Sequence, residues 1–382
     1  MHIRFLTGAL DAPAGAGAYD RRLIEALAER GHRITVVAAA GDRPDGPATV
    51  YPLPAPRLEG GPLRSLALPL SLRRGRRAVR RLALDAPDVT VASEHLFLRG
   101  HAARFRRRPW IYFPHDFSFP DEVARRVAPG LERRISLRSA RALQRWAVSR
   151  ADTTVRLCRS SMEAIMEQLS LEDMGRFTLI GPASWSEAAP HRREPAAPLR
   201  LLAVAPDMHP VRRLDLAIRA VLALPAGARW RLDIVGDGDD RTVYETQAAA
   251  DGRILPIRFH GNHADLSAFY AQADLLLFPS RLEHMGIVVI DAMRHGVPVL
   301  ALDSRIDGLH TASNEIIDNG ETGWLASSDD SFVAAVQRLV GDPAPVDAAG
   351  ARAHLIASRR FAWPPHVDRW EEVLTEVAAR GR

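Results

Sequence analysis

The sequence contains no lysine, because all 51 of its basic residues are arginine. Catalysis through a lysine amine, including Schiff-base chemistry, is therefore excluded. Cysteine is almost absent too: Cys158 is the only one, so the chain cannot form an internal disulfide. No cluster of cysteine and histidine surrounds it, which disfavours a metal site or a thiol nucleophile. We expect Cys158 to be a core residue.

Long apolar runs are also lacking. No stretch approaches the roughly 18 apolar residues of a membrane-spanning helix, and the first residues, MHIRFLTGAL, lack the features of a signal peptide. A cytoplasmic location is the resulting expectation. With 47% hydrophobic and 25% charged residues, the composition is that of a globular protein. The length of 382 residues fits two domains of ordinary size.

Charge is distributed unevenly along the chain. Residues 1–180 carry 30 arginines against 19 acidic residues, whereas residues 181–382 carry 21 against 27. A basic half can indicate binding to an anionic membrane or to nucleic acid, but in this arginine-rich chain solvated arginine faces explain it more simply. We expect no nucleic-acid partner. The stretch 73–81, RRGRRAVRR, fits either a basic helix at the inner face of the membrane or a surface helix of the first domain, which we favour.

Strand and helix patterns alternate along the first half. An apolar strand at 3–9 is followed by a loop of small residues and a helix at 18–30, which places Tyr19, Leu23 and Leu27 on one face and ends at Gly31. A second strand follows, which completes a βαβ unit. Further strands, separated by arginine-rich helical stretches, are expected at 87–95, 108–116 and 151–158. They predict one parallel sheet.

A polar segment with several prolines, 181–198, has the composition of a linker. The alternation of strands and helices restarts after it, so the sequence predicts two doubly wound, Rossmann-like α/β domains. We place an N-terminal domain at 1–182, a linker at 183–198, a C-terminal domain at 199–360 and a terminal helix at 361–382. Ligands of such sheets bind at the carboxyl ends of the strands, and two facing domains form a cleft.

The most informative motif lies at 279–300, PSRLEHMGIVVIDAMRHGVPVL. It resembles the signature of glycosyltransferase family 4, a class of retaining enzymes with the GT-B fold. That signature has two acids separated by seven residues, a glycine between them and a closing Gly-x-Pro-Val. The matching positions are Pro279, Ser280, Glu283, Gly286, Ala292, Met293, Gly296, Pro298 and Val299, and Asp291 takes the place of the second acid.

The resemblance extends, more weakly, over nearly the whole chain. It includes the first loop and helix (6–32), the strand end FPHD (113–116), the segments 233–238, 259–280 and 317–325, and the terminal stretch 361–377. The last of these is similar to the helix that crosses back to the first domain in this family. The resemblance implies a GT-B fold, in which two Rossmann-like domains face each other across a cleft.

The resemblance also implies roles for individual residues. Glu283 would accept hydrogen bonds from hydroxyls of the donor sugar and Asp291 from the ribose, because carboxylates are acceptors. Gly286 would open a helix whose free N–H groups suit a diphosphate. His115 would face the sugar and, with Glu283 and Arg212, form the catalytic set. The other residues implied in nucleotide-sugar binding are Gly15, Gly17, Arg213, Gly236, Gly261, His284, Met285 and Ile287.

Four features depart from the family pattern. The second acid is Asp291, which is one methylene shorter than the usual glutamate, and Pro206 stands where an arginine is expected. The charge that offsets the diphosphate must then come from Arg212 or Arg213. The loop 303–316 lacks the usual paired glycines, and 179–185 lacks the usual Asn-Gly.

Two other motifs have simpler explanations. A dinucleotide fingerprint in the first loop is disfavoured because Asp20 replaces its third glycine. The sequence GDGDD (236–240) fits a turn after a strand better than a pair of metal ligands, so we expect no required metal.

The expected activity is retaining transfer of a hexose-type sugar from a nucleotide-diphosphate sugar to a glycan, lipid-linked or small-molecule acceptor. The nucleotide sugar is a co-substrate, and no cofactor is expected. Two alternatives stay open. A weak or inactive nucleotide-sugar-binding protein would be consistent with Pro206 and Asp291, and a nucleotide-sugar epimerase would form its product without an acceptor.

Overall fold

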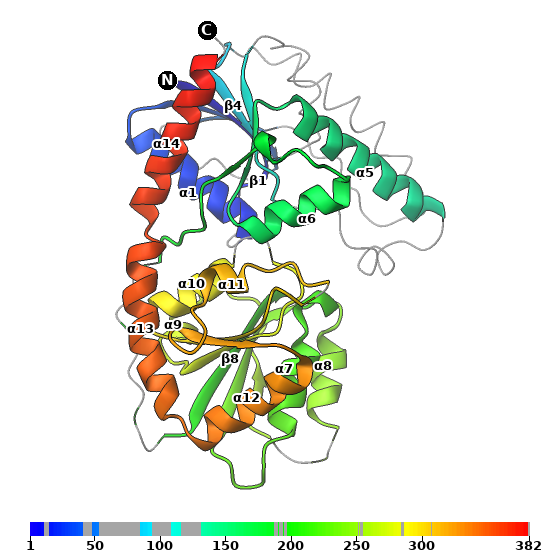
Figure 1. Ribbon diagram of the computed structural model, residues 1–382, viewed down its shortest axis with the longest axis vertical. Helices are drawn as coiled ribbons and strands as arrows, with labels where there is room; N and C mark the ends of the chain where they lie inside the picture. Colours follow the sequence, from blue (N-terminus) through cyan, green and yellow to red (C-terminus); the bar gives the residue numbers. More distant parts are fainter. Residues whose placement is uncertain are drawn as a thin grey trace. The chain divides into compact units, whose positions relative to one another are not determined.

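The structure is a computed structural model that describes residues 1–10, 15–40, 48–52, 85–93, 108–115, 131–186, 190, 194, 197–250, 252, 255–283, 286–306 and 308–380. The basic stretch 73–81 lies outside these residues. The chain divides into two compact units (Figure 1). Unit 1 comprises Met1–Arg156, Met162–Ile180 and Pro364–Arg382, and unit 2 comprises Leu157–Ser161 and Gly181–Trp363. The segment expected to be a linker, 183–198, falls within unit 2.

Unit 1 contains a sheet of seven strands in the order β3-β2-β1-β4-β5-β6-β7, with every neighbouring pair parallel. The order reverses between β1 and β4, which is the switch point of a doubly wound sheet. The strands are β1 (His2–Ala9), β2 (Arg33–Ala40), β3 (Thr49–Pro52), β4 (Val89–Ala92), β5 (Trp110–Tyr112), β6 (Thr153–Arg156) and β7 (Phe177–Leu179); the helices are α1 (Gly15–Glu29), α5 (Leu131–Arg150), α6 (Arg159–Leu169) and a 3-10 turn at Met174–Arg176.

The predicted βαβ unit is confirmed, with differences at its edges. Tyr19, Leu23 and Leu27 are buried on one face of α1, and Gly31 follows the helix with φ +84°, a conformation that favours glycine. The helix starts at Gly15, earlier than the expected residue 18, so Gly15 and Gly17 stand in its first turn. The short edge strands β3 and β7 were not predicted from the sequence.

Unit 2 contains a parallel sheet of six strands in the order β10-β9-β8-β11-β12-β13. Its strands are β8 (Leu199–Asp207), β9 (Trp230–Asp237), β10 (Ile257–Phe259), β11 (Leu275–Phe278), β12 (Val299–Leu302) and β13 (Gly323–Ala326). Its helices are α7 (Leu214–Leu222), α8 (Arg241–Ala248), α9 (Ser267–Tyr270), α10 (Ile287–Arg294), α11 (Ser313–Ile316), α12 (Asp329–Gly341) and α13 (Ala344–Arg360), with a 3-10 turn at Pro210–Arg212. Strand β13 was not predicted.

Both faces of this second sheet are covered. Along β8, Leu201 and Ala203 join a core that includes Phe332 of α12, whereas Leu202 and Val204 join a core with α10 and α13 on the other face. Alternate residues of a strand point to opposite faces, so a strand buried on both sides is apolar throughout. The predicted pair of doubly wound α/β domains is therefore confirmed. Cys158 belongs to the second core, as expected.

The last helix, α14 (Trp363–Arg380), packs in unit 1, and Figure 1 shows it beside α1. The indole N–H of Trp370, which is fully buried, donates to the Tyr19 hydroxyl at 2.8 Å, and that hydroxyl lies 2.5 Å from Nε2 of His366. Near the surface, Glu371 pairs with Arg30 at 2.5 Å. These contacts confirm the prediction that the terminal helix returns to the first domain.

No helix within the described ranges combines the length and the apolar content required to cross a lipid bilayer.

Replacing Trp370 with alanine should lower the free energy of unfolding by about 3–5 kcal/mol, because a large buried ring and its hydrogen bond to Tyr19 are lost. Urea unfolding followed by circular dichroism measures the change. Arg369→Ala, on the exposed face of the same helix where Arg369 pairs with Glu372, is the control and should change stability by less than about 0.5 kcal/mol. Equal effects of the two substitutions would contradict this role of α14.

Candidate functional site

The loops that follow β8, β9 and β10 meet at the carboxyl edge of the sheet of unit 2. Gly236, at the end of β9, has φ +140°, and a Cβ there would lie 1.7 Å from the carbonyl oxygen of Ala205. Its N–H donates to the Gly261 carbonyl at 2.8 Å, and Met208 N–H donates to the Asp237 carbonyl at 2.8 Å. Only glycine allows this approach of two backbones. The structure thus places the predicted residues Gly236 and Gly261 together, where doubly wound sheets bind ligands.

Arg212 and Glu283, which the sequence predicts as catalytic residues, form an ion pair. Nη1 of Arg212 lies 2.6 Å from Oε2 of Glu283, and the side chains are 26% and 18% exposed. The backbone positions both partners: Arg281 N–H donates to the Val211 carbonyl at 2.7 Å, and Glu283 N–H donates to the His310 carbonyl at 2.9 Å. The pair is therefore fixed on a partly exposed surface. The predicted residues His284 and Met285 lie outside the described residues.

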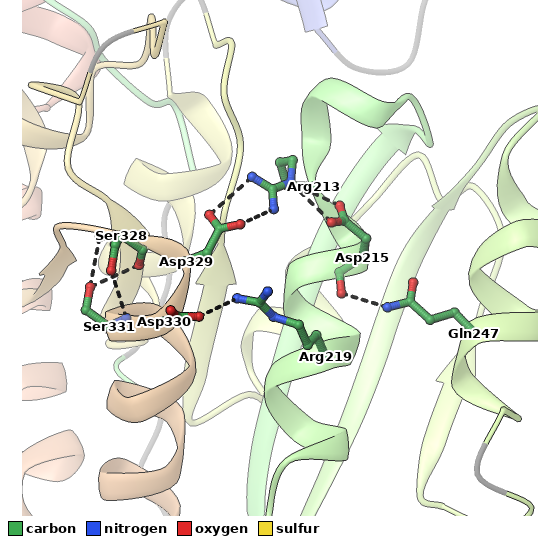
Figure 2. Close-up of polar contacts among 8 residues, drawn as sticks. All are labelled: Arg213, Asp215, Arg219, Gln247, Ser328, Asp329, Asp330 and Ser331. Atoms are coloured by element: carbon green, nitrogen blue, oxygen red, sulfur yellow. Dashed lines mark hydrogen bonds and ion pairs between the residues drawn. The ribbon is translucent and has the colours of Figure 1, made fainter.

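Arg213 is the next residue after Arg212, but its side chain does not join the Arg212–Glu283 pair. Its backbone is left-handed, with φ +53°, and its guanidinium lies between Asp215 and Asp329 (Figure 2). Nη2 is 2.6 Å from Oδ2 of Asp329, and Nε is 3.2 Å from Oδ1 of Asp215. Burial acts to lower the pKa of Arg213, but the hydrogen bonds to Asp329 and Asp215 outweigh it and raise that pKa. Arg213 thus joins the start of α7 to the start of α12.

The first turn of α10 presents backbone N–H donors. Gly286, its N-terminal cap, has φ +66°, and as a glycine it has no side chain that could cap the helix. Ile290 N–H donates to the Gly286 carbonyl at 3.0 Å; the N–H groups before it have no acceptor within the helix. A Cβ at Gly286 would lie 2.5 Å from Cδ1 of Ile316. This helix start has the form that binds anionic groups, with Ile287 as its first residue.

Asp291 lies farther along the same helix. Its carboxylate accepts a hydrogen bond from the hydroxyl of Ser184, whose own N–H donates to the Phe361 carbonyl at 3.1 Å. Burial raises the pKa of Asp291 to about 6, although the Ser184 hydrogen bond and the charge of Arg294 act in the opposite direction. The shorter second acid is thus held by the segment that precedes β8.

In unit 1, His115 follows β5 as predicted. Its Nε2 lies 2.7 Å from Oδ1 of Asp20, and its ring packs edge-on against Phe113 and Tyr19. Gly15, at φ +70°, opens α1, and Gly17 lies two residues on. Asp20 was not predicted as a site residue, although an acid on the apolar face of a helix was a visible signal. Ser184 gave no such signal in a linker-like segment.

Among the residues that the structure describes, no group of three or more His, Cys, Asp or Glu side chains could hold a metal ion. In the GDGDD segment, Gly238 N–H donates to Oδ1 of Asp237 at 2.8 Å, as in a turn. The thiol of Cys158 is buried, and burial raises its pKa.

Two family models match the sequence. One, described as glycosyl transferases group 1, matches residues 199–342, and the other, a glycosyl transferase 4-like domain, matches residues 14–183. This chain belongs to the group 1, 4-like family of glycosyltransferases. The two matched regions contain the sheets of unit 2 and of unit 1, apart from β1 at the start of the chain.

Curated relatives are similar over part of their length. The chain is 34% identical over 175 residues to an exopolysaccharide phosphotransferase of Streptomyces coelicolor, covering 45% of this chain and 18% of that protein. It is 29% identical over 241 residues to the glycogen synthase of Mycobacterium tuberculosis, covering 59% and 54%. The match thus spans about half or less of these relatives.

Solved structures show the same fold. Sucrose-phosphate synthase from Thermosynechococcus elongatus aligns with a TM-score of 0.76 at 18% identity, covering 100% of both chains. Anabaena HepE, in complex with UDP and glucose, aligns with a TM-score of 0.71 at 20% identity, covering 98% of this chain and 100% of that one. The predicted GT-B fold of this glycosyltransferase is therefore confirmed.

Replacing Gly286 with alanine should destabilise unit 2 by about 1–3 kcal/mol, because a left-handed backbone is costly for a residue with a Cβ. The contact with Ile316 adds to this cost. Thermal unfolding measures the change, with Gly341→Ala as a control, since a Cβ at Gly341 meets nothing within 4 Å. In the double variant with Ile316→Val, which lacks Cδ1, we expect the cost of the contact to be recovered and the backbone cost to remain. If the single variant Gly286→Ala were as stable as the wild type, this geometry would be contradicted.

The raised pKa of Asp291 predicts a pH dependence of stability. Folding raises the pKa of Asp291 from an ordinary value of 3.8 to about 6, so the folded state binds the proton more tightly than the unfolded state. Stability should therefore fall as the pH rises from about 4 to 6, by up to about 3 kcal/mol, and stay lower above pH 6. Asp291→Asn keeps the acceptor for Ser184 and should remove this fall. Urea unfolding at several pH values measures it.

Asp303 is the control of opposite sign. The hydrogen bond from Arg305 is opposed by burial but lowers the pKa of Asp303 to about 2. Its contribution to stability should be present above about pH 4 and be lost as the pH falls toward 2. Asp303→Asn should remove that acid loss and leave the fall between pH 4 and 6 unchanged. An unaltered pH profile in Asp291→Asn would contradict the assignment.

Proposed function

We propose that this glycosyltransferase transfers a hexose-type sugar, with retention of configuration, from a nucleotide-diphosphate sugar to a glycan, lipid-linked or small-molecule acceptor. The observation that carries the proposal is the Arg212–Glu283 ion pair, at 2.6 Å, three residues before the uncapped start of α10. The cation and the backbone N–H groups are then available for the diphosphate of such a donor, and the carboxylate is available for the sugar hydroxyls.

The diphosphate would bind at the start of α10 and to Arg212. The guanidinium of Arg213 is already paired with Asp215 and Asp329, whereas Arg212 pairs with one carboxylate among the described residues and its side chain is 26% exposed. When Arg212 turns to a phosphate, its contact with Glu283 breaks, and that carboxylate would accept hydrogen bonds from the sugar. The ion pair would thus hold both side chains in place until the donor separates them.

The ribose would be held by Asp291, whose carboxylate would accept from its hydroxyls in place of, or together with, Ser184. His115 would contact the sugar. Anabaena HepE has been solved with UDP-glucose, which makes UDP and UDP-glucose the first probes for this chain.

In the reaction, the bond between the anomeric carbon and the diphosphate oxygen breaks, and the acceptor oxygen bonds to that carbon on the same face. The acceptor proton passes to the departing phosphate oxygen. Arg212 and the N–H groups of α10 would stabilise the charge that develops on the leaving group, and orientation of the two substrates supplies much of the remaining acceleration.

Two substitutions test these roles separately. Arg212→Gln should weaken UDP binding about 10- to 100-fold, because a hydrogen bond to a charged group is lost. Glu283→Gln should leave UDP binding equal or tighter, since Arg212 loses its competing partner, and should strongly reduce sugar transfer. Thermal shift and calorimetry with UDP measure binding, and product analysis with UDP-glucose and an acceptor panel measures transfer.

The matched controls are Arg219→Gln, which alters an exposed pair with Asp330, and Glu245→Gln, which alters an exposed pair with Arg241; neither should change binding or transfer. Full transfer by Glu283→Gln would refute the site assignment. UDP binding without turnover across the acceptor panel would favour a binding protein, and product formation without an acceptor would favour an epimerase.

A further inference from the structure

Asp20 is a buried carboxylate for which the proposed reaction has no role so far. It lies on α1 and is 1% exposed. Its Oδ1 contacts Nε2 of His115 at 2.7 Å, and its Oδ2 accepts hydrogen bonds from the hydroxyls of Ser93, at 2.8 Å, and Thr7. A carboxylate that is buried to this extent is costly unless it is paired and hydrogen-bonded.

The partners of Asp20 come from three neighbouring strand ends. Thr7 is near the end of β1, Ser93 directly follows β4, and His115 follows β5. The sheet reverses its strand order between β1 and β4, and ligands of doubly wound sheets bind at such a switch point. The carboxylate therefore joins the strand ends at the position in unit 1 where this fold binds ligands.

These contacts determine which nitrogen of His115 carries the proton. An ionised carboxylate only accepts hydrogen bonds, so Nε2 must be the N–H donor to Oδ1. In a neutral imidazole the other nitrogen, Nδ1, is then an acceptor. Nδ1 makes no hydrogen bond to any residue that the structure describes, and the His115 side chain is 11% exposed.

The ring of His115 is held on its other sides by aromatic neighbours. Its centroid is 4.6 Å from that of Phe113, at an interplanar angle of 70°, and 6.0 Å from that of Tyr19, at 71°. Tyr19 is itself fixed by hydrogen bonds to His366 and Trp370. Rotation of the imidazole would break the contact with Asp20 and these ring contacts together.

We propose that Asp20 is a positioning residue of the transfer reaction, which holds His115 as the Nε2–H tautomer and presents Nδ1 as a hydrogen-bond acceptor to a hydroxyl of the bound sugar. The inference rests on the proposed function. It also defines the chemistry that His115 recognises: an acceptor nitrogen suits a hydroxyl and disfavours a phosphate oxygen, which carries no proton to donate.

The tautomer can be measured without any activity. In the full chain labelled with ¹⁵N at histidine, the His115 resonances are those lost in His115→Gln. At a pH where the ring is neutral, we expect the ¹⁵N spectrum to show that Nε2 carries the proton and that Nδ1 is unprotonated. Addition of UDP-glucose should shift the Nδ1 resonance, and UDP alone should not. A neutral ring protonated at Nδ1 would overturn the proposal, whether or not transfer is detected.

A double-mutant cycle tests whether Asp20 acts through His115. Asp20→Asn and His115→Ala should each lower kcat/KM for the donor about 10- to 100-fold, as expected for loss of a hydrogen bond to a charged or positioned group. The double variant should be no worse than His115→Ala alone, because the interaction is already absent. Multiplied losses in the double variant would show an independent structural role and overturn the proposal.

Asp88→Asn is the matched control in the same unit. Its Oδ2 accepts the backbone N–H of His2 at 2.8 Å, at the opposite end of β1, and it does not contact His115. This variant should retain the wild-type kcat/KM within about twofold and leave the His115 tautomer unchanged. If Asp20→Asn does not fold, the wild-type tautomer and its response to UDP-glucose decide the question. Absence of transfer in the wild-type protein would contradict the proposed function but would not alter that spectroscopic result.

Discussion

Both faces of a doubly wound sheet are covered by helices, so polar chemistry is restricted to the places where strands end. In unit 2 the residues of β8 alternate between two apolar cores, and a charged side chain there would be desolvated without a partner. The loops after β8, β9 and β10 escape this constraint, and the contact of Gly236 with Ala205 brings them together. In unit 1, Asp20 gathers the ends of β1, β4 and β5 in the same way.

The three acids of the candidate sites share one property: each is held by a hydrogen-bond donor of the protein. Glu283 has Arg212, Asp291 has Ser184, and Asp20 has His115. A partly buried carboxylate needs such a donor in the absence of ligand, and the donor also fixes its direction. On our proposal, the first two donors yield to phosphate and ribose when the nucleotide sugar binds, whereas the contact of Asp20 with His115 persists. The first two pairs would then be replaced by ligand, and the third would orient a side chain toward it.

The fold was predictable because its signals are local and repeated. Apolar strands alternate with helices such as α1, whose stop at Gly31 is readable from the sequence, and the motif around Gly286 identified the start of α10. Other features depend on residues far apart in the chain. The difference between Arg212 and Arg213 depends on Asp329, which lies 116 residues beyond Arg213. The short strands β3 and β7 lie at the sheet edges, and their few residues give no periodic signal.

Pro206 illustrates how one substitution can move a charge along the chain. Proline has no N–H to donate and is tolerated in a strand where pairing is interrupted. The register of β8 with β9 shifts between Val204 and Asp207, so Pro206 lies where the ladder is already irregular. Pro206 stands at the point where the resemblance leads us to expect an arginine, and the strand is followed by the turn Pro210–Arg212. Arg212, at the end of this turn, meets Glu283, so on our proposal it takes over the charge that an arginine at position 206 would have supplied.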